Sequence, residues 1–248
     1  MRKILNFTPF QLSIISGLLV GLSYPPIPGL TIWFGFVPLI HIWLNQNNKE
    51  SARFTFFSAI IFNSIAFYWI GLNSGASFFP VFLSLTGAVI YLSFIMSIFA
   101  WTVSCFEKKQ KDSGLFLIPF LWVVMEWLRS FGPLGFPWAN LAITQTNFLP
   151  LIQIIDFTGT EGVGFWIMIL NVYIYYLIKN NYVFSKKIIL LFVIIIVPWI
   201  YGTIRINQLD NQRWEHIEVA ALQPNINPNQ KWEPAYRNTL FSIKDSLN

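Results

Sequence analysis

Apolar residues run along this chain in seven long segments, which short polar stretches separate. A helix needs roughly 20 mostly apolar residues to cross the hydrocarbon core of a bilayer. The pattern therefore predicts an all-α polytopic membrane bundle of about seven transmembrane helices. The predicted spans are about Thr8–Ser23, Leu30–Leu44, Phe54–Leu72, Phe79–Cys105, Gly114–Phe131, Glu161–Ile178 and Lys187–Ile204.

Local signals define both ends of the first span. Thr8 is a suitable N-cap, and Pro9 follows it at the first helical position, where proline is favoured. Tyr24, Pro25 and Pro26 then mark the end of the span, because proline cannot continue a helix. We expect one helix between these signals.

Composition supports a membrane protein and excludes several other classes. Of the 248 residues, 55% are hydrophobic and only 11% are charged, whereas soluble domains carry about 25% charged residues. This balance excludes an ordinary cytosolic enzyme and a nucleic-acid-binding domain. The single cysteine and two histidines predict no disulfide, no metal centre and no cofactor.

The lysines and arginines predict the orientation of the chain. If the N-terminus is cytoplasmic, the inner segments hold ten lysines and arginines, whereas the outer loops before the last span hold only Arg129. This asymmetry agrees with the positive-inside rule. Seven spans then place everything after Ile204 outside the cytoplasm. The inner residues are Arg2, Lys3, Lys49, Arg53, Lys108, Lys109, Lys111, Lys179, Lys186 and Lys187.

The stretch from Glu126 to Gly164 is apolar but is broken by glycines and prolines, so it must pack on protein or lie at the outer interface. Within it, Glu126 and Arg129 are spaced i, i+3. One interpretation is a local ion pair that makes both charges tolerable near the membrane. The other is a polar contact for a lipid headgroup or for a domain docked above, since intramembrane charges are candidate functional groups.

Two further carboxylates follow in the same region. Thr158 and Glu161 match a capping box, which predicts a helix start there. Asp156 has no such local role, so we expect it to be an interfacial carboxylate or a partner of Arg129.

The composition changes after Tyr201. Ile217–Gln223 is typical of a buried strand, a turn-rich loop follows, and Pro234–Leu247 has the pattern of a helix. We therefore expect a transmembrane domain over residues 1–205 and the opening strand, loop and helix of an α/β domain over 206–248. A lone strand has no partner, so we expect further residues or a second chain to complete this domain.

The same residues resemble a known family. Glu126-Trp127-Leu128-Arg129, Gly135-Phe136-Pro137-Trp138, Pro150-Leu151-Ile152-Gln153 and Thr158-Gly159 with Gly162 look like bacterial apolipoprotein N-acyltransferase. Val219 to Ile226, followed by Lys231-Trp232, is similar to the start of that family's nitrilase-like domain. Ser23 to Pro26 resembles the family's break after its first span.

The resemblance implies a membrane bundle that carries an extracytoplasmic nitrilase-like α-β-β-α domain, with one further span after it. It implies a multi-pass protein of the bacterial cytoplasmic (inner) membrane, with its N-terminus cytoplasmic and its C-terminal part periplasmic. The enzymes of this family move an acyl chain from a phospholipid to the α-amino group of an N-terminal diacylglyceryl-cysteine, through a thioester. Phospholipid and diacylglyceryl lipoprotein are therefore the implied partners, and nucleic acid is not.

The family's catalytic Glu, Lys and Cys match no residue up to Asn248, so the resemblance assigns no catalytic residue here. Cys105 lies at the inner end of its predicted span and is expected to be a buried filler. We expect the chain to be inactive alone. The resemblance does imply substrate-binding residues: Trp232, Gln223, Asn225, Phe136, Pro137, Trp138, Glu126 and Arg129.

Three hypotheses follow for function. The chain is the membrane part of an acyltransferase, or a non-catalytic lipid- or lipoprotein-binding membrane module, or a small-molecule transporter. The transporter hypothesis needs paired broken spans and charges at the bilayer midplane. The charges of this chain lie mainly near the predicted interfaces, which disfavours it.

Overall fold

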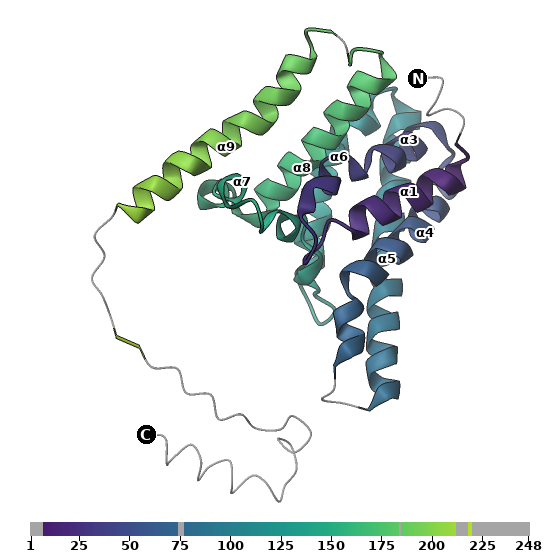
Figure 1. Ribbon diagram of the computed structural model, residues 1–248. Coiled ribbons are helices and arrows are strands. Elements are labelled where there is room, and N and C mark those ends of the chain that lie inside the picture. Colours follow the sequence, from purple (N-terminus) through teal and green to yellow (C-terminus); the bar gives the residue numbers. More distant parts are fainter. Residues whose placement is uncertain (1–6, 74–76, 184, 212–217, 220–248) are drawn as a thin grey trace, which may run out of the picture.

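The computed structural model describes residues 7–73, 77–183, 185–211 and 218–219. All regular secondary structure among these residues is helical (Figure 1). The order is α1 Pro9–Gly21, η2 Gly29–Thr31, α2 Ile32–Gly35, α3 Val37–Asn45, α4 Asn48–Ala66, η3 Tyr68–Leu72, α5 Phe78–Lys109, α6 Ser113–Arg129, η4 Pro137–Ala139, η5 Leu141–Gln145, α7 Leu149–Ile152, α8 Ile155–Lys179 and α9 Ile188–Asp210.

Three helices of the described part are long and apolar enough to cross a membrane. They are α5 with 32 residues, α8 with 25 and α9 with 23. At about 1.5 Å per residue, α5 is about 48 Å long and exceeds the roughly 30 Å hydrocarbon core. Its first turns accordingly project beyond the other helices, together with η3 (Figure 1).

Each of the seven predicted segments contains helix, although seven crossings stay a prediction. The predicted span Leu30–Leu44 corresponds to one apolar helical stretch, Gly29–Asn45, which consists of η2, α2 and α3. Its hydrogen-bond ladder is interrupted at Phe36, between α2 and α3. The side chain of Asn171 on α8 holds this break: its Oδ1 accepts from the Phe36 N–H at 2.9 Å, and its Nδ2 donates to the Ile32 carbonyl at 2.8 Å. The backbone groups that the break leaves without helical partners are thereby satisfied.

The start of α1 confirms the predicted cap. Thr8 Oγ1 accepts from the Gln11 N–H at 3.2 Å, and the Gln11 side chain accepts from the Thr8 N–H at 2.9 Å. The helix ends at Gly21, shortly before the proline pair. Sequence signals therefore defined this element correctly, because every group that fixes it is local.

The core lies where α1, α3, α4, α5 and α6 meet. Rings of four buried aromatic residues contact one another there, with centroids 5.2 Å apart for Trp43 and Phe99, 5.4 Å for Phe99 and Trp122, and 5.0 Å for Trp122 and Phe36. Edge-to-face contacts of this kind add to the energy of burial.

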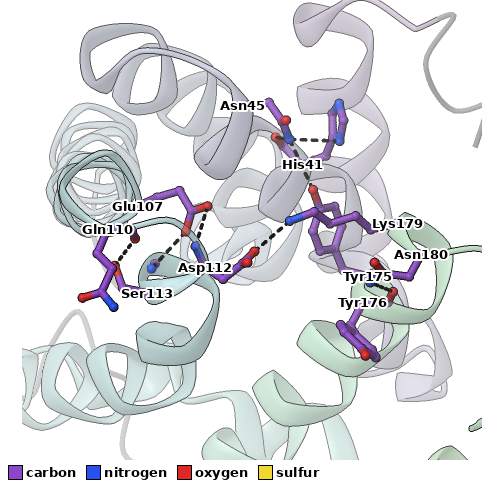
Figure 2. Close-up of polar contacts among 11 residues, drawn as sticks. His41, Asn45, Glu107, Gln110, Asp112, Ser113, Tyr175, Tyr176, Lys179 and Asn180 are labelled. Carbon is purple, nitrogen blue, oxygen red and sulfur yellow. Dashed lines mark hydrogen bonds and ion pairs between the residues drawn. The ribbon is translucent and has the colours of Figure 1, made fainter.

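A polar network joins the ends of α3, α5, α6 and α8 on the side of the bundle where α5 meets α6 (Figure 2). Lys179 Nζ donates to Asp112 Oδ1 at 2.9 Å, across 67 residues of sequence. Glu107 accepts from the Asp112 and Gly114 N–H groups at the start of α6. The hydrogen bond from Lys179 lowers the pKa of Asp112. The network ties the tight α5–α6 turn to α8.

Thr158 and Glu161 do not form the predicted capping box, but a helix does start at this point. α8 consists of two helices that meet at a kink at Gly159, whose φ of 67° and ψ of −177° lie outside the helical region. The Thr158 hydroxyl donates to the carbonyls of Ile154 and Gly159 instead. A backbone that only glycine adopts readily has replaced a side-chain cap.

Candidate functional site

The last turn of α6 carries the two charged residues that the sequence singled out. Glu126 and Arg129 are buried, with 2% and 7% of their surface exposed. Arg129 Nη2 lies 3.8 Å from Glu126 Oε1, so the predicted ion pair is present and is long. Charges this deeply buried are stable only when they are paired and hydrogen-bonded.

Both residues also hold the loop between α6 and α8, residues 130–154, which is called the α6–α8 loop below. The Leu141 N–H donates to Glu126 Oε1 at 2.9 Å, and the Phe136 N–H donates to the Arg129 carbonyl at 2.8 Å. One helical turn thus fixes two separate points of an irregular segment. This agrees with the expectation that the loop packs on protein.

Arg129 Nε is buried without a hydrogen-bond partner in the described residues. Trp122 Nε1 and Glu126 Oε2 are also buried without a partner of ordinary geometry, but the Trp122 indole lies close enough to interact with the Glu126 carboxylate. Unsatisfied buried polar atoms are rare in native structures, and each one calls for an explanation such as a ligand. Arg129 also borders a small enclosed cavity that Tyr24, in the loop after α1, and Asn63, on α4, line. The turn therefore combines charge, burial and unused hydrogen-bonding capacity.

An apolar groove runs along the seam between α5 and α6 and ends at Arg129. It encloses about 300 Å³. From Tyr91 to Thr102 it follows twelve residues of α5, which is about 17 Å at 1.5 Å per residue. We call it the α5–α6 groove. Its lining residues are Tyr91, Ile95, Ile98, Phe99 and Thr102 of α5, and Leu121, Val124, Met125, Leu128 and Arg129 of α6.

The groove has a buried floor and an exposed rim. Phe99 and Met125 form the floor and are buried, whereas Ile98, Val124 and Leu128 are exposed along the edges. Arg129 is the charged residue of the lining. A long apolar slot with one cation at its end matches the shape and charge of a lipid with an anionic headgroup.

Aromatic side chains of the α6–α8 loop pack against η3. The ring of Phe136 meets Phe67 edge-on at 5.2 Å, and Trp138 lies 5.4 Å from Trp69. Pro137, at the start of η4, is exposed. The structure thus brings Phe136 and Trp138 together with Glu126 and Arg129 through one loop.

Other predicted residues fall elsewhere. Asp156 is not a partner of Arg129: its Oδ2 accepts from Arg205 Nε, on α9. Trp232, Gln223 and Asn225, and the strand predicted at Ile217–Gln223, lie outside the described residues except for 218–219. Sequence reasoning missed the α5 side of the groove, because an apolar helix face gives no signal that distinguishes a binding surface from lipid contact.

The fold and the groove define a class of protein: a helical membrane protein with a lipid-facing slot that ends in a buried cation. Residues 16–173 match the model of the apolipoprotein N-acyltransferase N-terminal domain. The chain therefore belongs to the apolipoprotein N-acyltransferase family.

Curated relatives agree with this assignment. The chain is 28% identical over 250 residues to the apolipoprotein N-acyltransferase of Geobacter metallireducens, a match that covers 96% of this chain and 47% of the relative. It is 30% identical over 240 residues to the enzyme of Chlorobaculum tepidum, covering 91% of this chain and 43% of the relative. The match to the Thermotoga maritima enzyme is 26% identical over 232 residues and covers 89% of this chain and 45% of the relative. The chain spans about half the length of these relatives.

Proposed function

We propose that this protein takes part in phospholipid-dependent N-acylation of the N-terminal diacylglyceryl-cysteine of bacterial lipoproteins. The relatives bear the name apolipoprotein N-acyltransferase, which supports the reaction class. Within the proposal, residues 1–248 supply the membrane part. The Glu, Lys and Cys that the family uses are assigned to none of them.

The observation that carries the proposal is the position of Arg129 at the end of the α5–α6 groove. Its Nε is buried and has no partner in the described residues, while the rest of the groove is apolar apart from Thr102 and Tyr91. Guanidinium groups bind phosphate through paired hydrogen bonds. In this proposal an acyl chain of the donor phospholipid lies in the groove and its phosphate meets Arg129.

The α6–α8 loop supplies the second element of the proposal. Phe136, Pro137 and Trp138 present aromatic and apolar surface beside the turn that holds Arg129. Aromatic rings of this kind favour the headgroup region of a bilayer. We propose that this surface is the floor on which the diacylglyceryl group of the lipoprotein rests, on the periplasmic side of the cytoplasmic membrane.

A second candidate function uses the same groove without chemistry. A non-catalytic lipid- or lipoprotein-binding module would also need an apolar slot and a headgroup cation. A complete acyltransferase and a binding module both predict bound phospholipid, and only the former predicts N-acylated lipoprotein.

The test is a paired measurement on the protein expressed from its own gene in a host depleted of its N-acyltransferase. Native mass spectrometry measures phospholipid bound to the purified protein, and mass spectrometry of lipoprotein N-termini measures acylation. Val124→Trp fills the rim of the groove and leaves Arg129 intact, while Phe116→Trp changes an exposed residue of the same helix outside the groove.

We expect bound phospholipid with the unchanged protein and with Phe116→Trp, and N-acylation as well once the part that carries the Glu, Lys and Cys is present; Val124→Trp should lose both. Arg129→Gln should keep the protein in the membrane but reduce bound phospholipid at least tenfold, the factor for a lost charged hydrogen bond. Bound phospholipid without acylation would favour the binding module. Absence of bound phospholipid in the unchanged protein would overturn both readings.

A further inference from the structure

Helix α9 makes few contacts with the rest of the bundle. Only 6% of its most apolar 18-residue window is buried, and that window has a mean hydropathy of 2.3. In Figure 1, α9 meets α8 near their connecting turn and then leans away from it. The direction of α9 must therefore depend on a small number of specific contacts.

A proline in α9 creates one of these contacts. Pro198 has no N–H, so the carbonyl of Ile194, four residues earlier, loses its helical partner. The indole Nε1 of Trp166, on α8, donates to this same carbonyl at 2.8 Å. In a membrane, a carbonyl freed by proline needs a donor from a neighbouring helix, because lipid offers none.

Further contacts, with the start of α8 and with α7, lie on the same face of α9. Positions 194, 201 and 205 are separated by seven and four residues, which places them in one row along a helix. The Tyr201 ring meets Phe157 at 5.4 Å, and Arg205 pairs with Asp156. Next to them, a Cβ on Gly202 would overlap the carbonyl oxygen of Pro150. α9 therefore touches the bundle along one narrow line.

From this geometry we propose that Trp166 is a positioning residue that sets the direction of α9, by donating its indole N–H to the carbonyl that Pro198 leaves free. The proline makes this carbonyl different from the others in the interior of the helix, so it specifies the register at which α8 and α9 meet. The contact also fixes where the chain emerges after Asp210. Only this last consequence rests on the proposed function, in which the residues that follow α9 belong to the outer domain.

The test measures the position of α9 directly, by electron spin resonance distances in lipid nanodiscs. Cys105 is the single cysteine of the sequence, so Cys105→Ser gives a background for labels at Asn147→Cys and Gln208→Cys. Both label sites are exposed. Trp166 is replaced by 3-benzothienylalanine, which keeps the shape of the indole and exchanges its N–H for sulfur.

We expect this replacement to broaden the distance distribution and to raise the detached population of α9 about tenfold, the factor that one lost hydrogen bond predicts. Trp199→Phe, on an exposed face of α9, should leave the distribution unchanged. An unchanged distribution after replacement of Trp166 would overturn the proposal.

A second background separates hydrogen bonding from packing. In Pro198→Ala, the new N–H can bond the Ile194 carbonyl itself, so loss of the indole N–H should then change the detached population less than twofold. An equal effect in both backgrounds would assign Trp166 a packing role only and contradict the proposal. Phospholipid bound in the α5–α6 groove is measured on the same samples. Loss of bound phospholipid would count against the proposed function, whereas an unchanged α9 distance distribution would count against this inference.

Discussion

Removal of one charge from the buried pair Glu126 and Arg129 should destabilise the protein strongly, and removal of both should cost little more. Arg129→Met leaves the Glu126 carboxylate with two neutral donors, the Leu141 N–H and the Trp122 indole, and with no counter-charge. Glu126→Gln keeps an acceptor for Leu141 but leaves a buried guanidinium without its counter-charge. Each variant therefore exposes the cost of one unpaired buried charge.

The structure sets the size of the effect. Loss of one member of a buried pair costs about 3–5 kcal/mol. The separation of 3.8 Å is near the upper limit for an ion pair, so about 3 kcal/mol is expected for each single variant. The double variant removes both charges and should cost about 3 kcal/mol as well, which gives a coupling energy of about 3 kcal/mol.

The assay is reversible unfolding in mixed micelles with increasing SDS, followed by tryptophan fluorescence. Arg205→Met is the matched control, because its pair with Asp156 is about one-third exposed on each side and should contribute less than about 1 kcal/mol. Additive losses in the double variant would refute the reasoning, since they would mean that the two side chains stabilise the protein independently.

Three further predictions concern packing and charge elsewhere. Gly29→Ala places a Cβ against the carbonyl of Thr144, so the melting temperature should fall by an amount that corresponds to about 1–3 kcal/mol, measured by thermal unfolding in detergent. Asn171→Leu removes the side chain that bonds both sides of the α2–α3 break and should cost about 2–4 kcal/mol in the same assay, at about 1–2 kcal/mol for each orphaned backbone group. Asp112→Asn should cost less than about 1 kcal/mol at pH 7, because the bond to Lys179 is largely exposed. This bond lowers the pKa of Asp112 in the folded protein. Its contribution to stability is therefore present above the unfolded-state pKa of about 3.9 and is lost as the pH falls through the lowered value. The stabilities of the unchanged protein and of Asp112→Asn should converge in acid, and a difference that persists there would contradict this prediction.

Sequence reasoning succeeded where the determining groups are close together in the chain. Thr8 and Gln11 cap α1 within four residues of each other, and Glu126 and Arg129 share one helical turn. Such features depend on local geometry, which composition and spacing report directly. The apolar pattern also identified the segments that form helices, because burial in a bilayer selects residues position by position.

Prediction failed where the partner is distant in sequence. The break at Phe36 is held by Asn171, 135 residues away. Pro38 marks the start of α3 in the sequence, but nothing near Phe36 identifies Asn171 as its partner. Of the two roles expected for Asp156, pairing with Arg129 is wrong, because Arg205 is the cation that bonds it; its position at the interface stays a prediction. The apolar pattern indicates that a helix faces lipid, but it does not indicate which of its faces packs against which neighbouring helix. The groove between α5 and α6 beside Arg129 was therefore not predicted.

The position of Arg129 explains why loop and groove belong to one site. Its carbonyl holds the Phe136 N–H, while the neighbouring carboxylate of Glu126 holds the Leu141 N–H. Its guanidinium lies at the end of the α5–α6 groove. These bonds all originate from the last turn of α6, so the aromatic surface of the loop and the slot for an acyl chain keep a fixed spacing. Under the proposed function, this spacing sets two lipid groups side by side before any chemistry takes place, and proximity of this kind lowers the entropic part of a transfer barrier.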